Sequence, residues 1–107
     1  MVASLRGLPD SLLDCCATYN HKLARRSLFE AWDGHCAYCG REGADTLDHI
    51  RPKFKGGLNE ATNLIPSCRR CNGHKGAKDV EAWYRAQPFF TEERWAAIQQ
   101  WRRSPWV

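Results

Sequence analysis

The sequence predicts a small α+β fold in which a short β-hairpin lies between helical segments. Two observations predict this arrangement. Apolar residues recur at helical spacing on both sides of the middle of the chain, and the middle itself is rich in turn residues with two short apolar runs. With 107 residues the chain has room for one domain and one core. A domain this short buries a modest fraction of its surface, so we expect a further stabilising device.

The N-terminal part, residues 1–33, is expected to be a helical segment. Residues 10–20 are ambiguous, because their apolar side chains form one helical face only if a helix starts after Pro9 and Asp10. Residues 21–33 give a better signal, since four apolar residues recur at i, i+4, i+7 and i+8 and Gly34 follows as a stop. The four residues are Ala24, Leu28, Ala31 and Trp32.

The remaining elements follow from turn residues and caps. The apolar runs 46–50 and 63–65 are predicted to be the two strands of the hairpin. A short helix is expected to start between residues 67 and 70. Another helix should begin at Asp79 as its N-cap, and Thr91 should cap the last one. These elements divide the single domain into a core, residues 34–78, and C-terminal helices, residues 79–107.

Aromatic side chains are concentrated in the C-terminal helices. They could stack on nucleic-acid bases, but their helical spacing favours packing in the core of a small domain. The residues concerned are Trp83, Tyr84, Phe89, Phe90, Trp95 and Trp101.

Four of the six cysteines form two C-x2-C pairs, Cys36 with Cys39 and Cys68 with Cys71, separated by 28 residues. Zinc takes four thiolates in tetrahedral geometry, and two intervening residues let a tight turn aim both sulfurs at one ion. A closed four-ligand site leaves no position for water, so the spacing predicts a structural zinc ion. Disulfides are the weaker alternative, because nothing in the sequence indicates an oxidising compartment. Cys15 and Cys16 are expected to be small apolar side chains.

The charge distribution is typical of a protein that binds a polyanion. The formal net charge is +4, but seven basic residues lie between residues 51 and 78 against a single acid, Glu60. Such an excess suits nucleic acid, because each neutralised phosphate releases counterions. A solvated basic face is the alternative. The first twenty residues lack a signal-peptide pattern and no apolar run is long enough to span a membrane, so a cytoplasmic protein without membrane contact is expected.

A distinctive set of polar residues lies between and beside the cysteine pairs. Asp48 and His49 are followed by a Gly-Gly pair, Asn63 follows later, and Asn72 comes directly after the last cysteine. Phosphodiester hydrolysis requires a base that takes a proton from water, and a neutral imidazole suits that role near pH 7. It also requires a divalent cation held by hard oxygen ligands. The set therefore contains the residue types that a nuclease needs.

Between about Cys36 and Lys75 this pattern resembles the HNH nucleases, also called the His-metal finger or ββα-metal family, in their four-cysteine form. The resemblance implies a ββα-metal core stapled by zinc and an endonuclease that hydrolyses DNA. It implies His49 as the general base, Asp48 and Asn72 as ligands of a catalytic Mg²⁺ or Mn²⁺ ion, and a strand end that directs Asp48 and His49 into one site. Asn63 would orient His49 through a hydrogen bond.

The last motif position is Asn72 where the family often has histidine, which makes this an H-N-N motif. His74 is the alternative ligand, but on a helix it lies about 200° away from Asn72, so only one of the two can face the ion. Asn72 is favoured, and His74 is expected to contact phosphate or solvent.

The basic residues around the site are expected to hold phosphates and to read no bases. They are Arg51, Lys53, Lys55, Arg69, Arg70 and Lys75. The resemblance implies that the ββα unit enters the minor groove side of a duplex, with weak sequence preference. One site per chain would nick DNA, whereas a homodimer or an accessory protein would allow both strands to be cut. Two alternatives remain: a non-catalytic zinc module that binds nucleic acid or protein, and a nuclease active only with a partner.

Overall fold

The computed structural model describes residues 21–103, and the side chains of residues 25–103. The ambiguous segment 10–20, with Cys15 and Cys16, lies outside this range. Helix α1 (His21–Ala31) leads into an extended loop, and an antiparallel hairpin of β1 (Thr46–His49) and β2 (Leu64–Ser67) follows. Three helices complete the chain: α2 (Arg69–Lys75), α3 (Val80–Arg85) and α4 (Glu92–Arg103). The predicted α+β fold class is confirmed.

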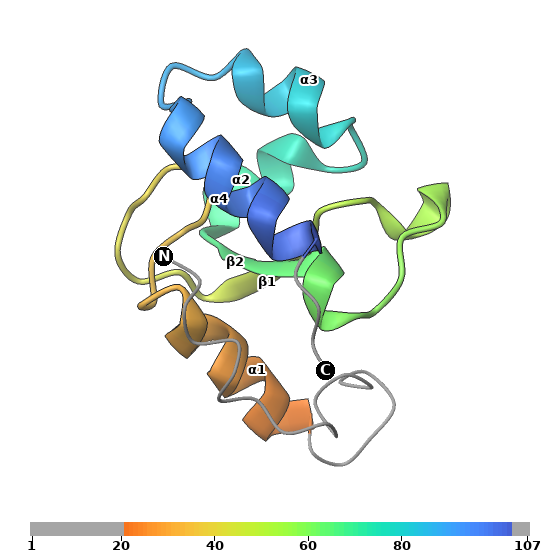
Figure 1. Ribbon diagram of the computed structural model, residues 1–107. Helices are drawn as coiled ribbons and strands as arrows, with labels where there is room; N and C mark the ends of the chain where they lie inside the picture. The colour runs from red at the N-terminus through yellow and green to blue at the C-terminus, as the bar shows by residue number, and fades with distance from the viewer. Residues whose placement is uncertain (1–20, 104–107) are drawn as a thin grey trace.

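The hairpin lies at the centre of the fold, as Figure 1 shows. Helix α4 crosses in front of it, α1 contacts β2, and α2 packs against β1. The loop between the two strands projects to the right of the view and carries short 3-10 turns at Lys53–Lys55 and Ala61–Asn63. The hairpin therefore presents one long, exposed loop beside the helices.

Strand β2 differs from the prediction, which ended it before Pro66. The strand continues to Ser67, and Pro66 pairs with Leu47. Proline lacks an N–H group, so it is tolerated only where that position faces away from a partner strand. In a two-stranded sheet each strand is an edge, which explains why Pro66 does not end the pairing.

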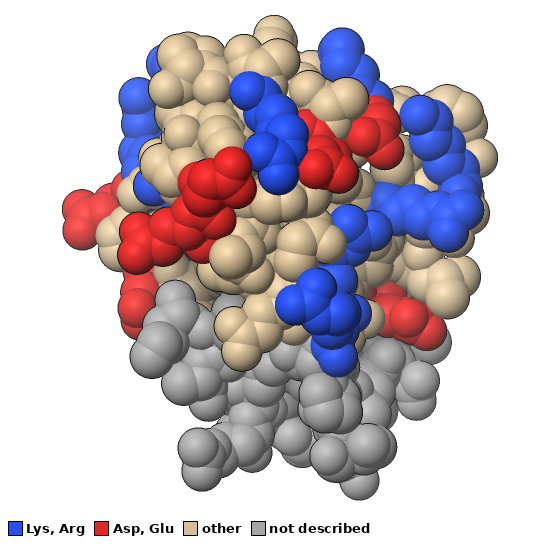
Figure 2. Space-filling view, turned by 45° about the horizontal axis from the view of Figure 1, so that its top comes forward, with Lys and Arg blue, Asp and Glu red and all other residues tan. Residues whose placement is uncertain are grey.

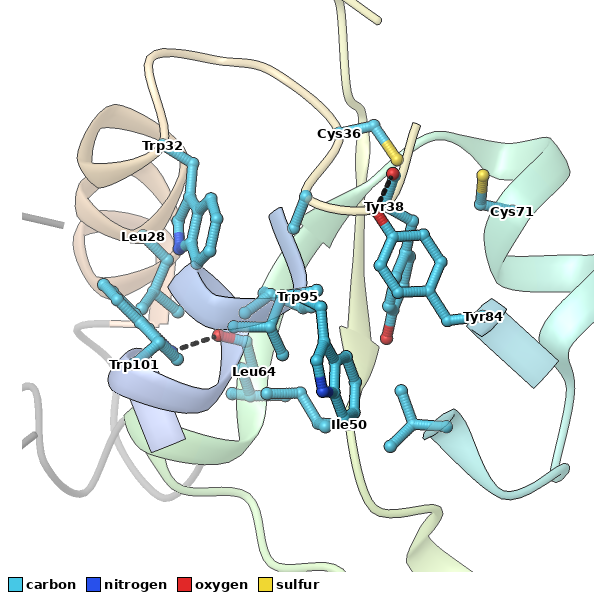
Figure 3. Close-up of a cluster of buried hydrophobic side chains, with 14 of the residues drawn as sticks. Leu28, Trp32, Cys36, Tyr38, Ile50, Leu64, Cys71, Tyr84, Trp95 and Trp101 are labelled. Carbon is cyan, nitrogen blue, oxygen red and sulfur yellow. Dashed lines mark hydrogen bonds between the residues drawn. The ribbon is translucent and has the colours of Figure 1, made fainter. Parts of the chain in front are cut away.

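The core is built largely from the predicted aromatic residues (Figure 3). Trp83, Tyr84, Trp95 and Trp101 are buried, and the two phenylalanines at 89–90 pack partly buried against them, so the prediction of core packing is confirmed. The Trp101 indole N–H donates to the carbonyl oxygens of Ala61 and Leu64, at 2.8 and 3.1 Å. Helix α4 is thereby fixed to the start of β2.

Both predicted helix caps are confirmed. The Asp79 carboxylate accepts a hydrogen bond from the Ala82 N–H at 3.0 Å, and the Thr91 hydroxyl accepts one from the Arg94 N–H at 3.1 Å. Within residues 21–103, no helix has the length and apolar character needed to cross a lipid bilayer.

Candidate functional site

The two cysteine pairs meet between the loop after α1 and the start of α2. Their four sulfur atoms lie within 4.8 Å of one another, and Cys39 Sγ is 3.8 Å from Cys68 Sγ. A tetrahedral zinc ion with Zn–S bonds of about 2.3 Å separates its sulfurs by about 3.8 Å. All four are free thiols and none is joined in a disulfide. The cluster therefore has the size and the ligands of a structural zinc site.

Each pair is shaped by its own backbone. The N–H groups of Cys39 and Cys71 point at Cys36 Sγ and Cys68 Sγ, both at 3.5 Å. In the first pair, Gly40 adopts a left-handed φ of 79°, and its N–H donates to the Cys36 carbonyl. The N–H groups of Cys39 and Cys71 favour the negatively charged form of the sulfur atoms that they contact, and this is the form that binds metal.

The pKa shifts of the four-cysteine cluster favour binding of a cation. A hydrogen bond from Cys71 lowers the pKa of Cys36 to about 5, whereas the same contact raises the pKa of Cys71. Burial raises the pKa of Cys39. The Cys36 thiolate is thus stabilised at the expense of those of Cys39 and Cys71, because negative charges this close repel one another. A divalent ion removes that conflict, and the donor set fits zinc.

Asp48 lies on β1 with only 4% of its surface exposed. Its Oδ2 atom accepts a hydrogen bond from the Tyr38 hydroxyl at 2.5 Å and lies 3.2 Å from the Lys75 ammonium nitrogen. Burial raises the pKa of Asp48, and the positive charge of Lys75 lowers it in part. Tyr38 belongs to the first cysteine pair and its pKa is raised well above the usual value by burial, so its hydroxyl stays a donor.

Lys75 is fully buried, which differs from the phosphate contact expected for it. Besides the Asp48 carboxylate, its ammonium group donates to the His49 carbonyl oxygen at 2.9 Å. A buried lysine is stable only when paired in this way. Lys75 therefore ties α2 to β1 and has no surface from which to reach DNA.

His49, the last residue of β1, is half-buried. Its Nε2 atom lies 2.5 Å from Asn59 Oδ1, in the loop between the strands. Because a carbonyl oxygen only accepts, this contact places the ring proton on Nε2. Among residues 25–103, Nδ1 has no hydrogen-bond partner, so its lone pair remains available to take a proton.

Asp48 and His49 have separate surroundings. The pairing of β1 with β2 is regular from Thr46 to His49, without the bulge that would turn both side chains the same way. Asp48 faces Tyr38 and Lys75, whereas the His49 ring contacts the loop. The bend implied by the resemblance is therefore not found within β1.

Asn63 supports the loop and makes no direct contact with His49, contrary to the expected hydrogen bond. Its amide oxygen accepts from the Arg51 N–H at 2.8 Å, and its amide nitrogen donates to the carbonyls of Arg51 and Leu58 at 3.1 and 2.9 Å. An asparagine side chain with three backbone partners pins two ends of a loop together. The residue whose side chain contacts His49 is Asn59.

Asn72 lies on the face of α2 that packs on β1. Its amide nitrogen donates to the Thr46 hydroxyl at 3.1 Å, and its side-chain oxygen has no partner among the described residues. His74 points elsewhere, because its Nδ1 accepts from the Trp83 indole N–H at 2.9 Å. The two side chains thus point in different directions, and His74 has Trp83 as a partner where a contact with phosphate or solvent was expected.

The remaining basic side chains expected to hold phosphates are exposed. They are Arg51, Lys53, Lys55, Arg69 and Arg70. Arg69 lies 3.1 Å from Asp45, and the Arg51 guanidinium donates to the Lys55 carbonyl at 2.8 Å. Figure 2 shows Lys and Arg side chains gathered on the right of the molecule, the side to which the loop between the strands projects in Figure 1.

Tyr38 and Asn59 were not found by reasoning from the sequence. Tyr38 reads as one of two spacer residues between cysteines, and nothing local marks its contact with Asp48. Asn59 follows the Gly56-Gly57 turn at a position where a polar residue is ordinary. The Gly56-Gly57 turn was the one signal in the sequence that could have indicated Asn59, since this turn folds the loop back towards the end of β1.

Comparison with known proteins finds sequence similarity over this part of the chain. The profile of the HNH endonuclease family matches residues 36–78. The chain is similar to YoqL of Bacillus subtilis (strain 168), an SPbeta prophage-derived protein whose name places it among HNH endonucleases. The identity is 28% over an alignment of 86 residues, and the match covers 65% of this chain and 36% of YoqL. It is also similar to the CRISPR-associated endonuclease Cas9 of Corynebacterium diphtheriae, at 38% identity over 52 residues.

That second match covers 45% of this chain and 5% of Cas9, so the chain spans only a minor part of either relative. No solved structure shows significant similarity to it. HNH nucleases act on nucleic acid, and the matched segment contains the four cysteines together with the Asp-His pair and both asparagines of the motif. The core of this chain, residues 36–78, belongs to the HNH endonuclease family.

Proposed function

We propose that the protein is a metal-dependent endonuclease that hydrolyses DNA phosphodiester bonds with His49 as general base. The observation that supports this most is the state of the imidazole. Asn59 holds the ring proton on Nε2, and Nδ1 remains open for a water molecule. The Nδ1 lone pair would take a proton from that water as its oxygen attacks phosphorus. Asn63 would keep this geometry indirectly, by holding the loop that carries Asn59.

Asp48 and Asn72 would hold the catalytic cation, Mg²⁺ or Mn²⁺. They lie on β1 and α2, which pack together, and each retains one side-chain oxygen without a hydrogen bond among residues 25–103. A carboxylate and an amide oxygen are the hard ligands that these ions take, with water and phosphate in the other positions. When bound, the ion would stabilise negative charge on the phosphate and on the leaving oxygen. The positive charge of Lys75 already compensates the negative charge of the Asp48 carboxylate. The catalytic ion and Lys75 would therefore bind to the same carboxylate group.

Zinc in the cysteine cluster would have a structural role. The cluster joins the loop after α1 to the start of α2, and Tyr38 extends that connection to β1. The proposed division of the chain follows from this: residues 34–78 form the catalytic core, and residues 1–33 and 79–107 flank it. One such core would nick a single strand, and a second copy or a partner would be needed for double-strand cleavage.

A plasmid nicking assay tests the proposal. Zinc-loaded wild-type protein should convert supercoiled DNA to the nicked form with Mg²⁺ or Mn²⁺, and His49→Ala should lose at least about 10²-fold of the rate, as expected for a missing general base. His35→Ala is the matched control, because this half-exposed histidine pairs with Glu42 outside the site. Equal cleavage by wild type and His49→Ala would contradict the proposal.

A second candidate function is a zinc module that binds nucleic acid or protein without cutting it. The ion pair of Asp48 with the buried Lys75 favours this candidate, because it neutralises the carboxylate that a catalytic cation needs. Metal binding separates the two functions. Isothermal titration of the zinc-loaded protein with Mn²⁺ should give one site that Asp48→Asn abolishes if the nuclease proposal is right, and no site if the protein is a binding module.

A further inference from the structure

The loop between the strands exposes two large apolar side chains next to its basic residues. Phe54 has 78% of its surface exposed and Leu58 has 58%, and they are the exposed large hydrophobic residues of the described part of the chain. Two large apolar side chains exposed on one short loop are candidates for contact with a ligand, because binding would remove their apolar surface from water. Lys53 and Lys55 flank Phe54 on both sides.

The loop holds these side chains in a fixed place. The Gly56 N–H donates to the Lys53 carbonyl, and the Gly57 N–H donates to the Pro52 carbonyl, both at 3.0 Å. A side chain at Gly57 would lie 1.8 Å from the Arg51 carbonyl oxygen, so the turn is closed as tightly as a glycine allows. Phe54 is therefore presented on an ordered turn and needs little ordering when it binds.

The same loop is connected to His49. Leu58 accepts a hydrogen bond from Asn63, and the next residue, Asn59, contacts the His49 ring. The exposed apolar side chains thus lie on the segment that positions the proposed base. A ligand that binds Phe54 would therefore contact the same loop that positions the base.

We propose that Phe54, supported by Leu58, is a wedge that inserts between neighbouring bases of duplex DNA while Lys53 and Lys55 hold the flanking phosphates. This inference rests on the proposed action on DNA. Apolar wedges of phenylalanine or leucine partly unstack a base step and bend the duplex, and nearby lysines compensate the phosphate charge. Between residues 51 and 59 every charged residue is basic, which favours DNA over an apolar protein surface as the partner.

Binding to duplexes in buffer without Mg²⁺ or Mn²⁺ tests the wedge independently of cleavage. Unstacking costs least at a mispaired base, so wild-type protein should bind a duplex with one central mismatch about tenfold more tightly than the fully paired duplex. 2-Aminopurine placed beside the mismatch should brighten on binding as its stacking is lost. Phe54→Ala should lose both effects, and Phe54→Leu, which keeps an apolar wedge, should retain most of them.

Salt dependence distinguishes the wedge from the lysines. Phe54→Ala should leave the slope of log K against log salt unchanged, whereas Lys53→Gln combined with Lys55→Gln should reduce it by about two. Equal affinity of wild type for matched and mismatched duplexes, unchanged 2-aminopurine fluorescence, or no duplex binding at all would overturn the wedge. Failure of the nuclease proposal has a different signature, since it is read from nicking by wild type and His49→Ala with metal present.

Discussion

The Tyr38 hydroxyl donates to Asp48 Oδ2 at 2.5 Å inside the core. Tyr38 stands between the two cysteines of the first pair, and Asp48 precedes His49 on β1. A single buried hydrogen bond therefore connects the cysteine cluster to the strand of the proposed active site. The carboxylate of Asp48 depends on this donor and on Lys75 for its stability in the interior.

Tyr38→Phe should destabilise the fold by about 1.5–3 kcal/mol, the usual contribution of a hydrogen bond to a charged group. Tyr84→Phe is the control, because the Tyr84 hydroxyl is also buried but contacts no carboxylate: it donates to the neutral Tyr38 carbonyl and accepts from Arg94 Nε at 3.2 Å. Arg94 Nε also donates to the Tyr38 carbonyl at 2.8 Å, so it keeps a partner in this variant. The loss in Tyr84→Phe should be smaller, about 0.5–1.5 kcal/mol. Urea unfolding of the zinc-loaded proteins measures both values, and equal losses would show that Asp48 is not the partner that matters.

The effect of Tyr38→Phe should depend on pH. Burial raises the pKa of Asp48, so the folded chain holds this proton more tightly than the unfolded chain, and stability falls as pH rises through the raised pKa. The Tyr38 hydrogen bond opposes that rise in pKa. In Tyr38→Phe, which lacks this hydrogen bond, the free energy of unfolding should fall further as pH rises. The stability difference between wild type and Tyr38→Phe should therefore widen with increasing pH and then level off. For Tyr84→Phe the difference should stay flat over the same range.

Local signals in the sequence predicted the helix caps, the presence of the hairpin and the cysteine cluster, although the end of β2 at Ser67 was missed. The caps Asp79 and Thr91 act on residues three positions away, and C-x2-C spacing is itself a local geometry. The contacts of Asp48 and His49 were not predictable in this way. Tyr38 and Asn59 each lie ten residues from their partners, and only the packing of the hairpin brings them together.

Removal of zinc should unfold the core. Each protein chain should contain one zinc ion, and a strong chelator should abolish the cooperative thermal transition, because metal binding in such sites supplies folding free energy. Cys68→Ser should lose zinc in the same way, since Cys68 both lines the cluster and caps α2. Elemental analysis and circular dichroism report the two outcomes.

Cys15→Ser serves as the control for this experiment, because Cys15 lacks a partner cysteine at ligand spacing. It should keep one zinc ion per chain and an unchanged melting temperature. Loss of zinc from Cys15→Ser, or full zinc content in Cys68→Ser, would contradict the assignment of the four ligands.

Asn59 and Asn63 should fail in different ways when each is replaced by alanine. Asn63→Ala removes three hydrogen bonds to the backbone of the loop and should cost about 2–3 kcal/mol of stability. Asn59→Ala should change stability by less than about 1 kcal/mol but slow nicking by about tenfold or more, because the His49 ring loses the partner that fixes its tautomer. Urea unfolding and the plasmid assay, run on both variants, separate a positioning residue from a structural one. A stable Asn63→Ala protein with impaired nicking would instead support the direct contact with His49 that the family pattern implies.

Gly57 and Gly73 offer a matched pair for the rigidity of the loop. An alanine Cβ at Gly57 would lie 1.8 Å from the Arg51 carbonyl oxygen, whereas nothing lies within 4 Å of a Cβ at Gly73, on α2. Gly57→Ala must therefore open the turn and should destabilise the protein by about 2 kcal/mol or more. Gly73→Ala should stabilise it by up to about 1 kcal/mol, because alanine is the better helix former.

If the loop positions Phe54 for insertion into DNA, Gly57→Ala should also reduce the preference for mismatched duplexes, and Gly73→Ala should leave this preference unchanged. A Gly57→Ala protein as stable as wild type would show that the turn yields easily and that the position of Phe54 is not fixed.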